Sequence, residues 1–448
     1  MNTVANNEGV QFNYAINYKK WLVWPAYILF FMMLFVPTTY QPIKAVLLAM
    51  ILLTIGTGAL VRGRLHLHMW VLLWTLLMVV TGLAFMSLGM VNNAPGALRV
   101  GTVYVLWPLV YTLLVSGISG KRVVDGIFKV MIFSLIAISI YSISYLLYVA
   151  GWLPHALYID LNMGQAVGFY GGYVEYNLYN ISSLNYLVPF VLAMLFVNHK
   201  RIGVPISRLW LWVSCLLGIV VAILSGRRAV WLILAISPMI VIVMRMFLSQ
   251  RFKVLNRRKV RRFLVAFPVI AVVLALLGIR ILGLNFSVIF EQLVSGFNFV
   301  NGGASESARA EQFFALMNGW MDSPLFGAGH GASVAGSLRS VKMSWAYELS
   351  YVALLFHTGI VGFFIYSAGV IWAFWMGLKI VRSGHWLGVY MLPTLVGTAC
   401  FLIANSTNPY LAKFDYIWVI FLPVSLINLW LLDKSKITQS EGQPCPHH

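Results

Sequence analysis

The residues best suited to chemistry lie in and around one long polar segment, Leu284–Lys342, of a chain that is 60% hydrophobic and 10% charged. Its features include Arg309, Glu291, Glu306, Glu311, Asp322 and the stretch Asp322-Ser-Pro-Leu-Phe-Gly-Ala-Gly-His330-Gly331. Glycine lets backbone amides approach a ligand closely, and long loops of this kind are usually functional. We therefore expect a binding or catalytic site to include part of this segment.

Two adjacent arginines, Arg227 and Arg228, follow Ser225-Gly226 and stand immediately before a long apolar run. A helix that begins there presents unpaired backbone N–H groups and the positive end of its dipole, and both favour an anion. Guanidinium groups match phosphate oxygens in pairs, so a pyrophosphate site is one interpretation. The other is a pair of interfacial arginines that contact lipid phosphates or a nearby acid. Arg280, near the end of another apolar run, fits a side chain that snorkels to the membrane surface.

Glu348 is the strongest candidate among the acids. The stretch 344–358 is predicted to form a short helix that leads into a span, with Glu348 and Tyr351 on one side of it. A carboxylate at a partly apolar membrane edge is expected to be more basic than in water, which suits a general base. The alternative is a solvated glutamate, or the counter-ion of Lys342 or of an arginine.

Arg309 lies in a stretch that is predicted to be an amphipathic helix. Its apolar face is formed by Phe313, Leu316, Met317 and Trp320. The alternative to a binding role for Arg309 is a local ion pair with Glu306, three residues earlier. His330 is more often structural than catalytic in such a turn, and it has no Cys, Asp or Glu at metal-ligand spacing.

The segment 151–180 is rich in tyrosine and asparagine, including Tyr173 and Tyr176. Tyrosine rings stack on the C–H faces of sugars, and amides hydrogen-bond their hydroxyls. The alternative is an aromatic loop at the membrane interface. Tyr351 and Trp320 are further candidates for sugar contact.

The composition determines the elements that must position these residues. Mean hydropathy is +0.85, which a soluble protein of 448 residues could not bury, so the predicted class is an all-α polytopic integral membrane protein. Runs of about 20 apolar residues recur, and each is long enough to cross a bilayer. They predict about twelve transmembrane helices in a single membrane domain, 1–448: 21–37, 43–61, 69–90, 98–117, 127–150, 181–198, 208–224, 229–248, 263–283, 359–381, 386–404 and 414–432.

The charges predict the orientation. Most of the 31 Lys and Arg residues fall at one set of span ends, and the positive-inside rule then places both termini in the cytoplasm. It places the loop 151–180 and the large helical loop 284–343, between the ninth and tenth spans, outside. The same rule accounts for most of the net charge of +19, so we expect membrane lipids and no nucleic acid as partners.

Three features occur in a fixed order. They are an arginine at the outer end of a span, the Arg309 helix followed by Ser-Pro-Leu-Phe-Gly-Ala-Gly-His-Gly, and a short helix leading into Gly359-Ile-Val-Gly362. This succession, over roughly residues 205–382, resembles the O-antigen polymerase and O-antigen ligase superfamily of bacterial surface-polysaccharide assembly. The resemblance implies a GT-C-like membrane fold and a bacterial inner-membrane location, with an active site that faces the periplasm. It also implies a glycosyltransferase that uses no cofactor, metal or nucleotide sugar.

The donor implied by the resemblance is an undecaprenyl-pyrophosphate-linked oligosaccharide. Arg227 and Arg309 match the family's arginines that are assigned to its pyrophosphate, whereas Arg228 and Arg280 match less cleanly. Ligases typically have His-Asn at the start of the short helix, and this chain has Tyr347-Glu348-Leu349, which is more like the polymerases. We therefore expect a polymerase that transfers the growing glycan to the non-reducing sugar of another lipid-linked repeat unit, with inversion.

In this scheme Glu348 is the general base and His330 the competing candidate. A chain-length regulator and a flippase are the expected protein partners. Two rival functions stay open. The first is a ligase that attaches the glycan to lipid A–core or to a protein. The second is a lipid-linked oligosaccharide flippase, which should line a central cavity with charges, whereas the charges here gather at span ends.

Overall fold

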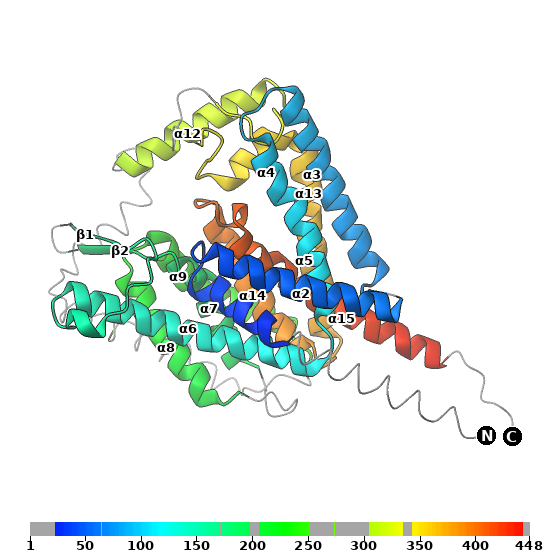
Figure 1. Cartoon of the computed structure of the whole chain (residues 1–448), viewed down its shortest axis with the longest axis horizontal. Helices are drawn as coiled ribbons and strands as arrows, with labels where there is room; N and C mark the ends of the chain where they lie inside the picture. Colours follow the sequence, from blue (N-terminus) through cyan, green and yellow to red (C-terminus); the bar gives the residue numbers. More distant parts are fainter. Residues whose placement is uncertain are drawn as a thin grey trace, which may run out of the picture.

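The computed structural model describes residues 23–63, 65–170, 173–197, 206–250, 273, 304–334 and 343–441. These residues form a helical bundle with one small β-hairpin (Figure 1). The helices are Val23–Phe35, α2 (Gln41–Arg62), α3 (Met69–Val91), α4 (Ala97–Tyr104), α5 (Leu106–Gly117), α6 (Lys121–Val149), α7 (Ile181–Leu195), α8 (Arg208–Leu224), α9 (Arg228–Met246), α12 (Ala304–Met321), α13 (Ser350–Arg382), α14 (Gly388–Asn405) and α15 (Phe414–Glu441). Two single-turn 3-10 helices are His155–Leu157 and Tyr410–Ala412.

Within these described ranges, eight helical segments are long and apolar enough to cross a membrane. One of the eight is α4 and α5 together, which bend at Val105. Three further apolar helices, Val23–Phe35, α7 and α8, are shorter. The prediction of an all-α, multi-pass membrane protein is confirmed at this level. The predicted span 263–283 lies outside the described residues except for residue 273, as do parts of the predicted loop 284–343.

The loop 151–180 contains a feature that the all-α prediction lacked. Strands β1 (Ala166–Tyr170) and β2 (Tyr173–Asn177) pair antiparallel, with Ala166 opposite Asn177 and Tyr170 opposite Tyr173. Only Gly171 and Gly172 separate the strands in the sequence, and two-residue hairpin connections favour glycine. The Gly-Gly pair is therefore a local sequence signal for the hairpin, and it is separate from the long apolar runs that predict the spans.

The bundle packs around α7 and α14, which lie along each other near its centre (Figure 1). Every residue of α7 is buried, which suits a helix that is apolar on all sides and enclosed by others. By contrast, α2 exposes large apolar side chains such as Leu53, Leu60 and Val61. Such exposure fits a helix whose outer face contacts lipid.

Helix α13 is interrupted near its start. Gly359 has φ 60° and ψ −170°, a conformation that breaks the helical hydrogen-bond ladder and that glycine tolerates best. The short helix predicted over 344–358 begins only at Ser350 and ends at this break. The chain before Ser350 is held instead by contacts with α12, which crosses the end of the bundle (Figure 1).

Candidate functional site

An ion pair joins α12 to the segment that precedes α13. Nε of Arg309 donates to Oε2 of Glu348 at 2.9 Å. The side chains are 36% and 28% exposed, so both groups can be reached from solvent. At this exposure such a pair stabilises a fold by only about 0–1 kcal/mol. The alternative of a local ion pair between Arg309 and Glu306 is not tested, because the side chain of Glu306 lies outside the described residues.

Gln312, three residues after Arg309 on α12, holds the backbone of the same segment. Its side chain is buried, and its Oε1 accepts hydrogen bonds from the N–H groups of Glu348 at 2.8 Å and Leu349 at 3.1 Å. Residues three apart share a helix face, so α12 fixes both the carboxylate and the backbone of Glu348. Sequence reasoning missed Gln312. The available signal was a polar residue four positions before Leu316 on the face that packs inward.

Glu348 precedes α13 rather than lying within it, so the predicted helical spacing between Glu348 and Tyr351 is wrong. The physical reason is that Gln312 binds the two N–H groups at this point. Tyr347 is also held: its hydroxyl accepts from the N–H of Val334 at 2.8 Å and donates to the carbonyl of Ala332 at 3.3 Å. Burial raises the pKa of Tyr347 to about 12.

The stretch Ser323–Gly331 joins the two halves of α13. Before the break, the carbonyls of Phe356 and His357 accept from the N–H groups of Ala328 and Gly329 at 3.0 and 2.9 Å. After it, the N–H groups of Ile360 and Val361 donate to Pro324 and Leu325 at 2.9 and 3.1 Å. Gly329 has φ 89°, and a Cβ there would meet the backbone of Gly89 on α3 at 2.2 Å. The glycines of this turn thus allow backbones to pack closely, and the turn supplies the bonds that the break removes.

His330 is a core residue of this turn. Its side chain is fully buried, its ring stacks on Tyr104 with centroids 4.3 Å apart, and its Nε2 lies 3.4 Å from the Tyr366 hydroxyl. Burial, with a smaller contribution from His357, lowers the pKa of His330 well below its usual value. The structure therefore keeps this ring neutral among α3, α4 and α13, whereas Glu348 is partly exposed at the pair with Arg309.

Arg227 forms a second cluster, at the start of α9. Its backbone N–H bonds Ser225 Oγ at 3.3 Å, and its Nη2 donates to Oδ1 of Asn177 at the end of β2. Its Nε is buried with no hydrogen-bond partner in the described part of the chain. Within the described residues, the Arg227 side chain makes no capping hydrogen bond to the first turn of α9, which Arg228 begins. A helix N-terminus next to a guanidinium is a suitable place for an anion.

The remaining candidates have different surroundings. Tyr176 is fully buried, and its hydroxyl donates to the Val221 carbonyl at 3.2 Å. Burial raises the pKa of Tyr176, and Arg227 partly opposes this. The Tyr351 hydroxyl donates to Leu402 at 2.6 Å, and Trp320 Nε1 donates to Pro324 at 3.1 Å. The hydroxyl groups of Tyr176 and Tyr351, which were predicted to contact sugars, therefore donate hydrogen bonds within the fold. Arg280 and the side chain of Tyr173 lie outside the described residues.

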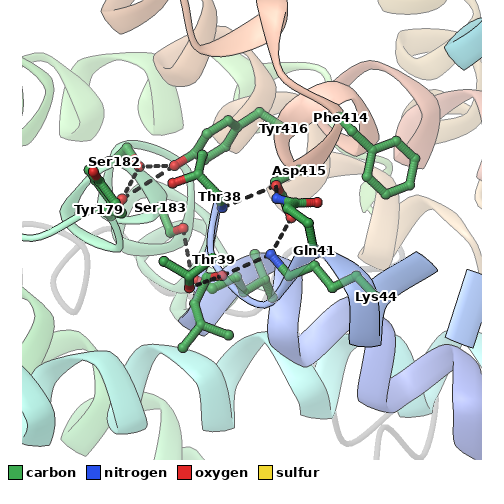
Figure 2. Close-up of polar contacts among 12 residues, drawn as sticks. Thr38, Thr39, Gln41, Lys44, Tyr179, Ser182, Ser183, Phe414, Asp415 and Tyr416 are labelled. Atoms are coloured by element: carbon green, nitrogen blue, oxygen red, sulfur yellow. Dashed lines mark hydrogen bonds and ion pairs between the residues drawn. The ribbon is translucent and has the colours of Figure 1, made fainter. Parts of the chain in front are cut away.

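A third polar cluster was not predicted. Nζ of Lys44 lies 2.5 Å from Oδ1 of Asp415, and the two side chains are only 1% and 2% exposed (Figure 2). Lys44 also donates to the Val36 carbonyl at 2.8 Å, and Oδ2 of Asp415 accepts from Thr38 N at 3.1 Å and from Gln41 Nε2 at 2.9 Å. The pair ties the start of α2 to the start of α15. Because these partners all belong to the chain itself, we infer that the pair stabilises the fold.

The three clusters differ in what they offer a ligand. Arg309 and Glu348 are accessible, Arg227 has one unpaired N–H beside a helix start, and the Lys44–Asp415 pair is closed. Among the described residues, no three His, Cys, Asp or Glu side chains gather as metal ligands do. A scan against protein-family models returns no match, and a search of curated proteins returns none either. A function must therefore be argued from the residues and their geometry.

Proposed function

We propose that this chain is a membrane glycosyltransferase that polymerises lipid-linked repeat units of a bacterial surface polysaccharide. It would transfer the growing glycan from undecaprenyl pyrophosphate to the non-reducing sugar of another repeat unit, on the periplasmic face of the inner membrane. The observation that carries the proposal is the accessible pair of Arg309 with Glu348, 39 residues apart in sequence and both held by α12.

The pair combines the two groups that this reaction needs. A pyrophosphate leaves the anomeric carbon easily once its negative charge is neutralised, and arginine is well suited to bind it. A carboxylate at hydrogen-bond distance can accept the proton of the attacking hydroxyl. When the donor binds, its phosphate would replace Glu348 as the partner of Arg309. Glu348 would then act on the acceptor hydroxyl.

Arg227 would supply a second contact to the donor phosphates. Its Nε, which has no hydrogen-bond partner among the described residues, and the positive end of the α9 dipole both favour an anion. In this scheme the proton passes from the acceptor hydroxyl to Glu348, the acceptor oxygen bonds to the anomeric carbon, and the pyrophosphate leaves with the bonding electrons. A single in-line displacement inverts the anomeric centre.

The finer architecture is part of the proposal. The helical segments of the described residues would be completed by the apolar run 263–283 to give about twelve spans. Both termini would lie in the cytoplasm, because most Lys and Arg residues then lie inside. The starts of α9, α13 and α15 would face the periplasm together with α12. Chain-length regulators and a flippase would act on the same lipid-linked glycan.

The test is reconstitution of the purified full chain with a synthetic undecaprenyl-pyrophosphate repeat unit, without metal or nucleotide sugar. We expect a ladder of products that differ by one repeat unit. Transfer only when lipid A–core is added would identify a ligase instead. Movement of the intact substrate across the vesicle membrane without new glycosidic bonds would identify a flippase. Either result would overturn the polymerase.

A further inference from the structure

A cavity of about 130 Å³ lies among five helices. Its walls come from Val23–Phe35, α2, α5, α6 and α15, and it is partly open to the surroundings. Almost all of the lining side chains are aliphatic or aromatic, among them Leu29, Ile55 and Phe421. Such walls favour an apolar occupant over water.

The few polar groups in the wall have little to offer a polar ligand. The Tyr27 hydroxyl donates to Val123 at 3.3 Å, that of Tyr111 to Phe414 at 2.7 Å, and that of Ser425 to Phe421 at 2.7 Å. The Trp418 indole N–H is buried without a hydrogen-bond partner in the described part of the chain. A buried water needs two to four polar partners, so one N–H cannot hold it. The chemistry of the wall selects a hydrocarbon chain.

Basic residues stand at one end of this cavity. Its lining includes Ile118 and Val123, which flank Lys121 and Arg122 in the chain. Arg122 is exposed, and α6 begins there after Gly120 without a side-chain cap. A guanidinium at the start of a helix favours a phosphate group. An apolar cavity that reaches a basic helix start matches the two parts of a membrane phospholipid.

We propose that this cavity binds a segment of one acyl chain of an anionic membrane phospholipid, with the lipid phosphate at Lys121 and Arg122. The occupant is a lipid of the bilayer rather than the polyprenyl donor, because Lys121 begins the 29-residue helix α6, whose other end leads to the loop with the hairpin beside Arg227. At 1.5 Å per residue that helix is roughly 43 Å long, which separates this phosphate site from the arginine clusters. The bound lipid fills the gap between Val23–Phe35 and α15. This site is independent of the proposed reaction.

The test uses the full chain in phosphatidylcholine vesicles that contain a phospholipid with a diazirine at the end of one acyl chain. The probe is phosphatidylglycerol in one sample and phosphatidylcholine in the other, at equal mole fraction. After photolysis, labelled peptides are mapped by mass spectrometry. We expect labels at the end of the cavity away from Lys121, near Met33 and Tyr111. They should be about fivefold stronger for the anionic probe, given the usual strength of a basic residue near a membrane surface.

Variants separate the two parts of the site. Arg122→Gln should reduce labelling by the anionic probe about fivefold, whereas Arg208→Gln, at the start of α8, should leave it unchanged. Ala26→Trp should fill the cavity and abolish labelling by both probes. Equal labelling by both probes, labels mapped elsewhere, or displacement of the label by undecaprenyl phosphate more readily than by phosphatidylglycerol would overturn the proposal. If a variant does not fold, the comparison of the two probes on the unmodified chain still tests the proposal.

Discussion

Two ion pairs stand where long helices begin, and they differ in almost every physical respect. The Lys44–Asp415 pair is nearly inaccessible to solvent, and backbone and amide groups form further hydrogen bonds with both side chains. The Arg309–Glu348 pair is about one-third exposed. Its backbone is fixed by Gln312, but its charged ends can be reached. Burial, and not the presence of opposite charges, separates a structural pair from one that can exchange its partner for a ligand.

The largest effect is expected where the buried pair is broken. Asp415→Ala leaves the Lys44 ammonium enclosed without its counter-ion and should lower the free energy of unfolding by about 3–5 kcal/mol. The measurement is denaturant unfolding of the full chain in micelles. The double variant Lys44→Met with Asp415→Leu should recover most of the loss, because no charge is then left buried. If Asp415→Ala unfolds at the same denaturant concentration as the unmodified chain, the buried pair stabilises the fold no more than the accessible pair does.

The accessible pair should behave in the opposite way. Arg309→Ala should change the free energy of unfolding by no more than about 1 kcal/mol, because the pair is exposed. It should reduce polymer formation by about 10²–10³-fold, the usual cost of one group that stabilises developing charge. Glu348→Gln should give a similar loss, and Glu311→Gln, exposed on the same helix, should serve as the unaffected control. Full activity in both pair variants would contradict the proposed site.

A smaller effect is expected at Gln312, which supports the accessible pair without offering a charge. Gln312→Leu leaves the N–H groups of Glu348 and Leu349 without their acceptor and should cost about 1–3 kcal/mol of stability. Activity should also fall, because the carboxylate loses its fixed backbone. Unfolding and product ladders are measured together, with Asn318→Ala on the exposed side of α12 as the control. A loss of activity without any loss of stability would assign Gln312 to ligand contact instead.

The bundle was predictable from the sequence because long apolar runs encode membrane-spanning helices directly. The break at Gly359 and the start of α13 at Ser350 were not, because they depend on partners distant in sequence. Pro324 and Leu325 accept the bonds that Ile360 and Val361 would otherwise lack, and local propensity contains no trace of this. The hairpin had a signal in its Gly-Gly pair, but it is short and lies between long spans.

The candidate site likewise depends on partners that are distant in the sequence. Arg309 and Glu348 were each predicted as functional, and the structure shows Glu348 as the counter-ion of an arginine, which was the alternative for that residue. Which arginine pairs with it was not predicted, because nothing in the 38 intervening residues fixes their distance. His330 and Tyr176 were predicted from residue type, and both are buried. A residue type indicates a capability, whereas burial determines whether a ligand can use it. The burial of an individual side chain is difficult to predict from a single sequence.

The smallest effect concerns the turn that supports the accessible pair, and it should appear only in acid. His330 is buried and neutral with a lowered pKa, whereas in the unfolded chain its pKa is near 6.5. Below about pH 6.5 the unfolded state therefore binds a proton that the folded state does not, so stability falls as pH falls, by at most about 1.4 kcal/mol per pH unit. Above that pH the folded and unfolded chains bind the same number of protons at this site, and the dependence disappears.

Hydrogen exchange at pH 7 and at pH 5.5, corrected for the intrinsic effect of pH on exchange, locates this loss. We expect protection to fall at Ser323–Gly331 and at the first turns after Gly359, because the two share their backbone hydrogen bonds. It should stay unchanged around Lys44 and Asp415. His330→Phe keeps an aromatic ring against Tyr104 and removes one of two buried histidines in this region, so the pH dependence of protection should weaken, with His357 accounting for the remainder. An equal loss of protection around both ion pairs in acid would show that the two regions unfold as one unit. The two pairs would then differ only in their exposure to solvent.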